Sequence, residues 1–450
     1  MKGRPHPKQE KEKDDFSGFR MHYILYLCGV LVLLSLYFYL RPSSSSWNPI
    51  YSSTPPTIPH ILSADLRPAC FVNALPPSPL PLKTVSLPVT TVLITGVAGF
   101  IGSHMALLLL EDKEAEYRVI GIDDMSRGHP HLVQVIQTAV KHLPEKRFFR
   151  FVEMSVGDTE KVTQLLQREK VDVVMHFAGY AYAGESVQFP LKYFENTVSQ
   201  TTGLLNALEN AKINRFVYSS SSATYGAVPS ECQPTTEDYS QLPTSPYGLS
   251  KLQAEQQIIA FANGRPSFSY VLLRYFNVIG ADHPPGSLGP VPKPELRKFG
   301  RIVDSAFDVI LGDSKSLSVF GTDYKDTGDA RNHASTEDGT AVRDYIHVSD
   351  LIDAHKRAIP VSTDGQRLVY NIGIGRGFTV KQLLAAVSSA TGKPIKVETG
   401  PRRPGDPSIT MGASSKLQNE LKWTPRHTNL TAIVLDQWKW RQYFQKVQQK

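Results

Sequence analysis

Short apolar runs and longer amphipathic stretches alternate along the chain from about residue 90. Each run is rich in β-branched and aromatic residues and is followed by a stretch with the apolar period of a helix; the runs are TTVLIT, RVIGID, FRFVEM, VDVVMHF, RFVYSSS and SYVLLRYF. Runs of this length and composition are typical of buried strands. Strands that alternate with helices predict an α/β fold of Rossmann type, with a doubly wound parallel sheet.

This alternation stops near Asn277. Beyond it lie Pro- and Gly-rich segments, three strand-like runs that we interpret as isolated strands (LSVFG, YNIG and IKVET), and three helical stretches. We therefore predict a Rossmann domain over 90–280 and a smaller substrate-binding α/β domain over 281–443, interleaved with the first. The segment Thr327–Thr336 (TGDARNHAST) has loop composition and is expected to form an exposed insertion.

An apolar segment near the N-terminus has a different character. Tyr23–Leu40 is an uncharged run of 18 residues, which at about 1.5 Å per residue would span about 27 Å, close to the core of a thin bilayer. Six Lys or Arg residues precede it, and only Arg41 follows within the next twenty positions. The positive-inside rule therefore predicts a single-pass type II protein with a cytosolic tail (1–22), a transmembrane helix (23–40) and a Ser-, Thr- and Pro-rich stem (41–89).

This topology would place the globular part in the lumen of the secretory pathway, and the segment length favours the Golgi membrane. A cleaved signal peptide is the alternative, but the charged tail, the long apolar run and the lack of a small-residue cleavage site favour an anchor. In a lumen, Cys70 and Cys232 could form one disulfide, because the third cysteine, Cys28, lies in the anchor. Asn429 begins a sequon for N-glycosylation.

Charge and cysteine spacing argue against two kinds of site. The net charge is +7, but four of these charges lie before residue 92, which leaves a surplus of only three for the globular part. This surplus is too small to indicate a nucleic-acid partner. No two cysteines have the C-x-x-C spacing of a metal site, and no metal is expected.

A glycine-rich turn is predicted between the first strand and the first helix. Gly96, Gly99 and Gly102, with Phe100 and Ile101 between them, lie in TGVAGFIGSH. Glycines at this spacing let the backbone approach a dinucleotide pyrophosphate, whose charge is stabilised by the helix N-terminus. The sequence therefore predicts a dinucleotide site at this turn.

An acidic residue ends the next strand, about twenty positions further on. Asp123 in VIGIDD can accept hydrogen bonds from the hydroxyls of the adenosine ribose, so NAD is the predicted cofactor. Arg127 is a counter-indication, because a nearby arginine could hold the 2′-phosphate of NADP.

Three residues predict a site that removes a proton from an alcohol. Tyr247 and Lys251 in SPYGLSK share one helix face, and Ser221 ends the strand FVYSSSS at the carboxyl edge of the sheet. To act as a base at neutral pH, a tyrosine must lower its pKa by about three units, or roughly 4 kcal/mol. A lysine cation about 5 Å away supplies roughly 3 kcal/mol at an effective dielectric constant near 20, and the positive nicotinamide of NAD can add the rest. Tyr247 would take the hydroxyl proton while hydride leaves for NAD, with Ser221 hydrogen-bonded to the same oxygen.

Several motifs together resemble the extended short-chain dehydrogenase/reductase family in its UDP-glucose 4-epimerase branch. They are TGVAGFIGSH, HFAGYAYAGES, SSSSATYG, SPYGLSK, LRYFNVIGA and VRDYIHVSDL, and the resemblance runs from about Thr90 to Tyr443. YAYAGES, QFPLKYF, FGTDYK, PELRKFGRI and HTNL are most similar to the plant-type UDP-arabinose (UDP-xylose) 4-epimerases, which are Golgi type II proteins. The resemblance implies an NAD-dependent isomerase that inverts C4 of a UDP-sugar through a transient 4-keto sugar, and a homodimer.

The resemblance also implies further ligand contacts. Tyr247 and Lys251 would touch the cofactor as well as the substrate region. The other matching cofactor positions are Asp158 for adenine, Phe177, Ala178 and Gly179 for the pyrophosphate side, and Asn196 and Tyr275 near cofactor and substrate. The substrate positions are Ser221 and Tyr247 for the sugar, Asn277, Arg343 and Arg403 for the diphosphate, and Asp406 for a ribose. Planar guanidinium groups suit a diphosphate.

Val97, Leu249 and the Thr327–Thr336 insertion depart from the family pattern, and two further positions depart from the bacterial galactose epimerases near the substrate. Ala181 stands where they have a lysine near the diphosphate, and Thr410 stands where many have a tyrosine that narrows the sugar pocket. UDP-xylose/UDP-arabinose is therefore the expected substrate pair and UDP-glucose/UDP-galactose the alternative, with UDP-glucuronate more remote. The motifs themselves do not distinguish a pentose from a hexose.

Other reactions and classes fit the sequence less well. Dehydratases and decarboxylases on this fold need an acid just after the catalytic serine, where this chain has Ser222 and Ala223. A type II glycosyltransferase or an NAD-binding regulatory protein would not need Ser221, Tyr247 and Lys251. Tightly held NAD would distinguish an epimerase from a transferase.

Overall fold

The computed structural model describes residues 89–144, 146–282, 288–324, 336–403 and 406–448, all within one compact unit, Pro68–Lys450. The predicted tail (1–22), the anchor (23–40) and all but the last residue of the stem (41–89) lie outside the described residues, as does most of the Thr327–Thr336 insertion. Within the described ranges, no helix combines the length and the apolar character needed to cross a membrane.

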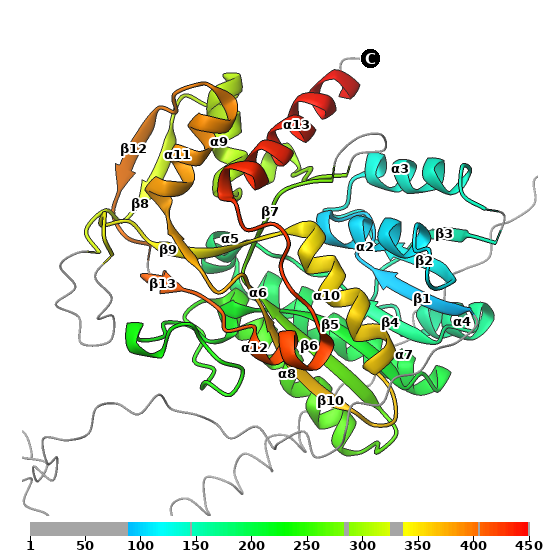
Figure 1. The fold of residues 1–450 in the computed structure, drawn as a ribbon. Coiled ribbons are helices and arrows are strands. Elements are labelled where there is room, and N and C mark those ends of the chain that lie inside the picture. The colour runs from blue at the N-terminus through cyan, green and yellow to red at the C-terminus, as the bar shows by residue number, and fades with distance from the viewer. Residues whose placement is uncertain (1–88, 145, 283–287, 325–335, 404–405, 449–450) are drawn as a thin grey trace, which may run out of the picture. The chain divides into compact units, whose positions relative to one another are not determined.

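Seven strands form the main sheet in the order β10-β6-β5-β4-β1-β2-β3 (Figure 1). They are β1 (Thr90–Thr95), β2 (Tyr117–Asp123), β3 (Phe148–Glu153), β4 (Val173–His176), β5 (Arg215–Ser221), β6 (Ser269–Tyr275) and β10 (Arg367–Ile372). Every neighbouring pair is parallel. The strand order reverses between β1 and β4, and doubly wound sheets bind ligands at the carboxyl ends of strands at such a point. The predicted Rossmann-type sheet is confirmed.

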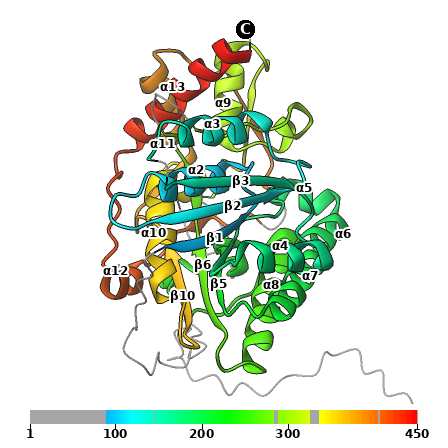
Figure 2. The ribbon, with the colours of Figure 1, turned by 90° about the vertical axis from the view of Figure 1, so that its right-hand side faces the viewer.

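Helices cover both faces of this sheet (Figure 2). One face carries α2 (Phe100–Leu110), α3 (Pro130–Val140), α10 (Val348–Val361) and α12 (Ser415–Leu421), and the other carries α4 (Thr159–Glu169), α7 (Gln200–Ala211) and α8 (Pro246–Asn263). Val92 and Ile94 of β1 pack into the core on the α2 side, whereas Leu93 packs into the core on the α4 side. All three side chains are fully buried, which explains why the strands are apolar throughout rather than alternating.

Two short helices and one π-helical turn connect β4 to α7. These are α5 (Ala183–Gln188), α6 (Pro190–Tyr193) and the turn Phe194–Ser199. They follow the carboxyl end of β4, so they stand beside the glycine-rich turn that follows β1.

The smaller domain consists of two small sheets and three helices (Figure 1). The first sheet contains β7 (Asn277–Ile279), β9 (Val342–His347), β11 (Gly377–Thr379) and β13 (Ile409–Thr410), and the second contains β8 (Leu317–Phe320) and β12 (Val397–Gly400). The helices are α9 (Ile302–Leu311), α11 (Val380–Thr391) and α13 (Leu430–Gln448). Apolar residues from all three helices, including Phe307, Leu383 and Trp438, form its core.

The expectation of isolated strands and three helices beyond Asn277 is wrong in two respects. YNIG ends β10, which pairs with β6 as an edge strand of the main sheet, and LSVFG and IKVET pair with each other as β8 and β12. The described residues beyond Asn277 contain five α-helices, of which α10 and α12 return to the main sheet. A short apolar run predicts a strand but carries no information about its partner, because the partner depends on the packing of the whole chain.

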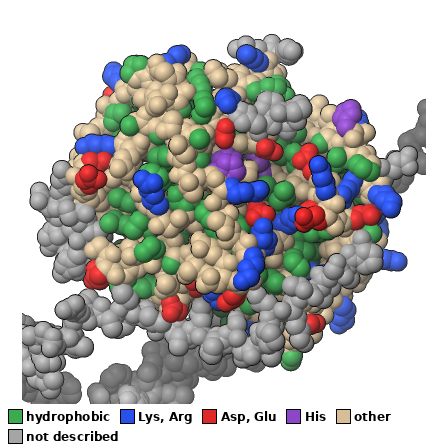
Figure 3. Space-filling view, viewed as in Figure 1, with side chains coloured by type: hydrophobic (Ala, Val, Ile, Leu, Met, Phe, Trp, Pro, Cys, Tyr) green, Lys and Arg blue, Asp and Glu red, His purple; other side chains and the backbone are tan. Residues whose placement is uncertain are grey.

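The surface seen in Figure 3 carries Lys and Arg side chains interspersed with Asp and Glu. On this face the two signs of charge therefore lie close enough to offset each other.

Candidate active site

The glycine-rich turn joins β1 to α2 with very little space around its backbone. Gly96 has a positive φ of 71°, and a Cβ atom there would lie 2.7 Å from the backbone nitrogen of Ala178. A Cβ atom on Gly102 would lie 2.2 Å from the carbonyl oxygen of Gly96. Gly99 caps α2 without a side-chain hydrogen bond, so no side chain occupies the first N–H groups, which include those of Phe100 and Ile101. This cradle fits the pyrophosphate of a dinucleotide.

Asp123 ends β2 beside this turn. Its carboxylate accepts hydrogen bonds from the backbone N–H groups of Ala98 (3.0 Å) and Met125 (2.9 Å). Burial raises the pKa of Asp123 to about 6, although these two hydrogen bonds act in the opposite direction. A carboxylate has about four acceptor positions, so Asp123 keeps capacity for the ribose hydroxyls that the sequence predicted.

The segment after β4 lies on the other side of β1. The Ala178 N–H donates to the Thr95 hydroxyl at 3.2 Å, and Gly179 has a φ of 151°. The Asn196 side-chain oxygen accepts from the Tyr180 N–H at 2.8 Å. This hydrogen bond holds the backbone of the segment in place. Phe177, Ala178 and Gly179 are therefore brought to the glycine-rich turn, while their contacts with a cofactor stay predictions.

Asp158 has a clear structural task. It caps the N-terminus of α4 by accepting from the Lys161 N–H, and it forms an exposed ion pair with the Lys161 ammonium at 2.7 Å. Its predicted contact with adenine is compatible with this position in the connection from β3 to α4 but stays a prediction.

Helix α8 places Tyr247 and Lys251 one turn apart. Ser245 caps the helix by accepting from the Gly248 N–H at 3.1 Å, and Pro246 occupies the first helical position, which its fixed φ favours. The Tyr247 N–H donates to the Ser186 hydroxyl at 3.1 Å, so α5 also fixes the start of α8.

The three predicted catalytic residues are brought together. Ser221 is the last residue of β5, and its side chain is hydrogen-bonded to Tyr247. The Lys251 ammonium donates to the Ser219 carbonyl oxygen at 3.0 Å. Tyr247 and Lys251 are both buried, which protects a proton transfer from bulk water.

Electrostatics at this site differ from the sequence-based expectation. Burial raises the pKa of Tyr247, and the hydrogen bond from Ser221 and the charge of Arg301 only oppose this effect. Burial also lowers the pKa of Lys251 to about 8. The sequence-based argument, in which the Lys251 charge supplies most of the shift and the nicotinamide supplies the rest, left out burial, which disfavours the charged form of both groups.

The predicted substrate residues fall into two groups. Tyr275 ends β6, where its hydroxyl lies 3.0 Å from the Ser219 hydroxyl, and Asn277 begins β7 with an exposed side chain. In the smaller domain, Asp406 accepts from Arg343 at 2.6 Å and from Arg403 at 2.9 Å. Burial by itself would raise the pKa of the Asp406 carboxyl. The charges and hydrogen bonds of the two arginines outweigh burial and lower this pKa. The structure thus assembles the predicted arginine pair around one carboxylate.

Two of the departures noted in the sequence, Thr410 and Ala181, lie in different parts of the fold. Thr410 on β13 is the register partner of Arg343 on β9. Ala181 is exposed in the segment that follows β4.

Sequence reasoning missed Arg301. Its guanidinium carbon lies 4.9 Å from the centre of the Phe100 ring, and its charge acts against burial to lower the pKa of both Tyr247 and Tyr275. Arg301 precedes α9 in the smaller domain, so that domain contributes a positive charge near the catalytic phenol. Its motif, PELRKFGRI, was a signal in the sequence, but nothing local tied this arginine to Tyr247.

Sequence reasoning also missed the partner of Arg127. Arg127 donates through Nη2 to both oxygens of Glu185, at 2.7 and 2.6 Å. Glu185 belongs to the YAYAGES motif and lies 58 residues away along the chain. Because this carboxylate already binds Arg127, the arginine no longer favours a 2′-phosphate, and therefore NADP, over NAD.

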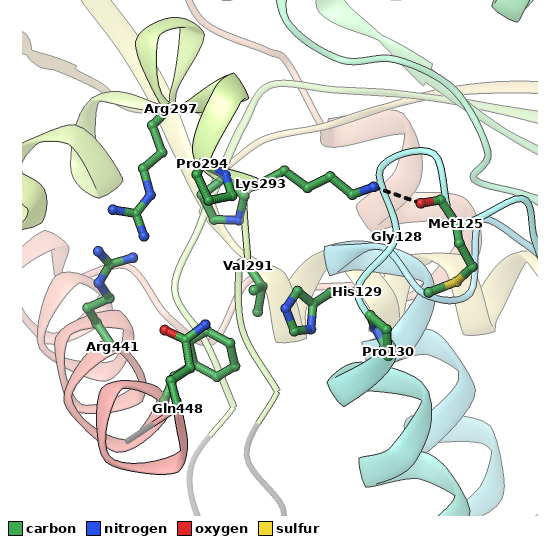
Figure 4. A pocket seen from close by; sticks show the side chains of 12 residues that line it. Met125, Gly128, His129, Pro130, Val291, Lys293, Pro294, Arg297, Arg441 and Gln448 are labelled. Carbon is green, nitrogen blue, oxygen red and sulfur yellow. Dashed lines mark hydrogen bonds between the residues drawn. The ribbon is translucent and has the colours of Figure 1, made fainter. Parts of the chain in front are cut away.

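A cavity of about 350 Å³ lies beside the segment that follows β2 (Figure 4). Met125, His129 and Lys293 contribute to one part of its wall, and Arg297 and Arg441 face each other at another part. Lys293 donates to the Met125 carbonyl oxygen at 2.9 Å. None of the predicted catalytic residues lines this cavity, so we do not assign the reaction to it.

Known proteins resemble this chain in sequence and in fold. The sequence profile of the NAD dependent epimerase/dehydratase family matches residues 92–373. UDP-arabinose 4-epimerase 1 of Arabidopsis thaliana is 42% identical over 353 residues, which cover 78% of this chain and 80% of that protein. UDP-glucose 4-epimerase of Lactobacillus helveticus is 37% identical over 350 residues, which cover 78% of this chain and 96% of that protein. A crystal structure of UDP-glucose 4-epimerase from Stenotrophomonas maltophila, with bound NAD and formylated UDP-arabinopyranose, has a TM-score of 0.70 and 31% identity, covering 80% of this chain and 99% of that one.

Proposed function

Because this chain belongs to the NAD dependent epimerase/dehydratase family, we propose that its active site inverts C4 of a UDP-pentose and interconverts UDP-xylose with UDP-arabinose. The protein is an NAD-dependent nucleotide-sugar 4-epimerase. The observation that carries the proposal for the catalytic residues is the buried arrangement of Tyr247, hydrogen-bonded to Ser221 and one helical turn from Lys251.

Three side chains of this protein carry out the proton transfer. Tyr247 removes the proton from the C4 hydroxyl, and Ser221 holds the same oxygen in line with the phenol. Lys251, fixed by the Ser219 carbonyl oxygen, stabilises the Tyr247 phenolate that accepts this proton. Bound NAD accepts hydride from C4 and returns it to the opposite face of the transient 4-keto sugar.

The substrate must stay bound while its sugar ring turns over. Arg343 and Arg403 carry N–H groups beyond those used on Asp406, and these would hold the diphosphate. Asp406 stays ionised because the arginine charges outweigh its burial, so it keeps both guanidinium groups in place. The ribose role predicted for Asp406 belongs to the same proposal.

The choice of a pentose rests on similarity. The Arabidopsis UDP-arabinose 4-epimerase is 42% identical to this chain, against 37% for the Lactobacillus UDP-glucose 4-epimerase, over nearly the same length. Arg301 is the observation that keeps UDP-glucuronate as a second candidate, because a guanidinium near Tyr247 could bind a C5 carboxylate.

The purified full chain should be incubated separately with UDP-arabinose, UDP-galactose and UDP-glucuronate, and each product separated by chromatography. We expect the highest kcat/KM for UDP-arabinose. A higher value for UDP-galactose or UDP-glucuronate would overturn the pentose assignment and leave the epimerase intact. Failure to convert any of the three would overturn the catalytic assignment.

The anchor and its compartment are part of the same proposal. The apolar run Tyr23–Leu40 and the preceding positive charges support a single-pass type II protein of the Golgi membrane with a lumenal active site. Cys232 is disulfide-bonded, and disulfides persist in oxidising compartments such as this lumen. Asn429 is exposed, so we expect its sequon to carry a glycan in cells. An Asn429→Gln chain with unchanged electrophoretic mobility would contradict a glycosylated lumenal domain.

A homodimer is supported by an exposed apolar patch. Val187, Phe189 and Leu191 are 51%, 50% and 78% exposed, and Leu249 on α8 is 38% exposed. An apolar patch of this kind on a soluble domain marks an interaction surface, and a second copy is the simplest partner. Leu191→Glu should convert a dimer into monomers in sedimentation experiments, whereas a wild-type monomer would contradict the proposal.

A further inference from the structure

Arg127 and Glu185 join two segments that leave the carboxyl edge of the main sheet. Arg127 follows β2, and Glu185 lies in α5, which follows β4. The Arg127 Nη2 donates to both carboxylate oxygens of Glu185, at 2.7 and 2.6 Å. The side chains are only 16% and 3% exposed, so solvent screens this ion pair far less than a surface pair.

Neighbouring side chains hold the pair in place. The Arg127 guanidinium lies 3.6 Å from the centre of the Tyr180 ring. Glu185 also accepts from the Tyr193 hydroxyl at 2.8 Å and from the Lys192 ammonium at 3.1 Å. Burial opposes the ionisation of Glu185, but these donors outweigh it and lower its pKa. The carboxylate is therefore charged and its position is fixed.

The strand order determines what this ion pair crosses. In the main sheet β1 lies between β4 and β2. A bridge from the segment after β2 to the segment after β4 must therefore pass over the carboxyl end of β1. The glycine-rich turn that begins at Gly96 starts at that end, and this turn is the place that fits a dinucleotide pyrophosphate.

One nitrogen of this arginine has no use within the described protein. Nη1 of Arg127 is shielded from solvent and has no hydrogen-bond partner among the described residues. A buried guanidinium N–H group without an acceptor is rare in folded proteins. An anionic oxygen beside the glycine-rich turn would supply the missing acceptor.

We propose that Arg127 and Glu185 form a clasp over the pyrophosphate of bound NAD, in which Glu185 fixes Nη2 and Nη1 is left to donate to a phosphate oxygen. This inference rests on the binding of NAD at the glycine-rich turn. The clasp gives Arg127 a role as a cofactor-binding residue and Glu185 a role as its positioning residue. It would slow the release of NAD, which an epimerase must keep while its sugar is oxidised.

The clasp is tested by the rate at which NAD leaves the protein. The wild-type full chain, Arg127→Gln, Glu185→Gln and the double variant are loaded with isotopically labelled NAD and diluted into excess unlabelled NAD. We expect each single variant to release NAD about ten- to hundredfold faster than wild type, the size of one lost charged hydrogen bond. The double variant should release NAD no faster than the faster single variant, because both substitutions disrupt the same ion pair.

Two controls separate the clasp from a general loss of structure. Arg168→Gln breaks the Arg168–Glu169 pair on α4, whose arginine side chain is 61% exposed, and should leave NAD release unchanged. Competition with ADP-ribose and with adenosine separates a phosphate contact from a mere brace. Arg127→Gln should weaken binding of ADP-ribose and leave binding of adenosine, which has no phosphate, unchanged.

Three results would overturn the proposal. Release of NAD at the wild-type rate from Arg127→Gln would remove the clasp but leave the epimerase assignment intact. Equal weakening of ADP-ribose and adenosine would reduce the pair to a structural brace. A wild-type chain that neither carries NAD nor takes it up would overturn the proposed function together with the clasp.

Discussion

Tyr247 and Lys251 are both buried, and burial shifts their pKa values in opposite directions, each toward the neutral form. The protein by itself therefore holds a protonated phenol beside an amine with a pKa of about 8. Arg301, in contact with Phe100, adds a positive charge that favours the phenolate. The nicotinamide charge of bound NAD would act in the same direction and favour the phenolate further.

The role of Tyr247 as the base leads to a direct test. Tyr247→Phe keeps the ring but removes the phenolic oxygen that, when ionised, accepts the proton, so kcat should fall about a hundred- to ten-thousandfold. Binding of UDP should be nearly unchanged, because the predicted diphosphate residues are on the smaller domain. Epimerisation at a near-normal rate, measured by product chromatography, would show that another group is the base.

Burial of Lys251 makes a prediction about stability and pH. In the unfolded chain a lysine titrates near its ordinary value of about 10.4, whereas folded Lys251 has a pKa of about 8. Between these values the unfolded state binds more protons, so this residue's contribution to the free energy of unfolding rises with pH there. The stability of Lys251→Met relative to wild type should therefore be greatest below about pH 8 and decline as pH rises toward 10.4. Urea unfolding across this range measures the difference, and a constant difference would contradict a depressed pKa.

At the scale of secondary-structure elements, two helix N-termini organise the site. Helix α2 begins at the glycine-rich turn and leaves its first N–H groups uncapped by side chains, as a phosphate-binding helix requires. Helix α8 is capped by Ser245 and begins at Pro246, so its first turn is rigid and carries Tyr247. One N-terminus is thus open to a ligand and the other is closed to hold a side chain.

The cap of α8 should affect activity as well as stability. Ser245→Ala removes the hydroxyl that accepts from the Gly248 N–H and should cost about 1 kcal/mol of stability. Because Tyr247 lies in the first turn, kcat should also fall. Thr379 caps α11 in the smaller domain and its hydroxyl also donates to Asp338, so Thr379→Ala is a control that should cost at least as much stability with little loss of kcat. Equal kcat in the two variants would show that the cap does not position the phenol.

The turn between β1 and α2 has no room for a side chain. Gly102→Ala would place a Cβ atom 2.2 Å from the Gly96 carbonyl oxygen, so the turn must shift and binding of NAD should weaken strongly. At Gly184 a Cβ atom would meet nothing within 4 Å, so Gly184→Ala should leave NAD binding close to wild type. NAD content after gel filtration measures both, and a fully loaded Gly102→Ala protein would argue against the cradle.

At the scale of the whole molecule, the predicted cofactor and substrate sites draw on different parts of the chain. The glycine-rich turn, Asp123 and residues 177–179 lie at the carboxyl ends of β1, β2 and β4 of the main sheet, whereas Arg343, Arg403 and Asp406 belong to the smaller domain. Arg301 links the two because it precedes α9 and contacts Phe100 at the start of α2. Arg301 therefore brings a positive charge of the smaller domain to the start of α2.

Binding of the cofactor should stabilise the whole unit. At a concentration one hundred times its Kd, NAD should add about 2.7 kcal/mol to the free energy of unfolding and raise Tm accordingly. NADP should add much less, because Asp123, predicted to accept from the ribose hydroxyls, would repel a 2′-phosphate and Arg127 is held by Glu185. Thermal melting of the stripped full chain with each dinucleotide provides the measurement. Equal shifts for NAD and NADP would contradict the assignment of Asp123.

Patterns among residues that are close together in the sequence were sufficient to predict part of this structure. The strand and helix alternation, the glycine spacing around Gly96 and the four-residue step from Tyr247 to Lys251 each lie within a few positions of one another. Backbone geometry over such short distances is set by local sterics and periodicity. These features therefore predicted the Rossmann-type sheet and the members of the catalytic cluster.

The tertiary structure decided which distant residues meet and how burial changes their charge. The 58 positions between Arg127 and Glu185, the approach of Arg301 to Phe100, and the return of β10 to the edge of the main sheet have no local signal. The pKa values of Tyr247 and Lys251 likewise depend on desolvation by the assembled core. Both kinds of information arise only when segments far apart in the chain exclude water together, because neither contact partners nor burial are properties of a short stretch of sequence.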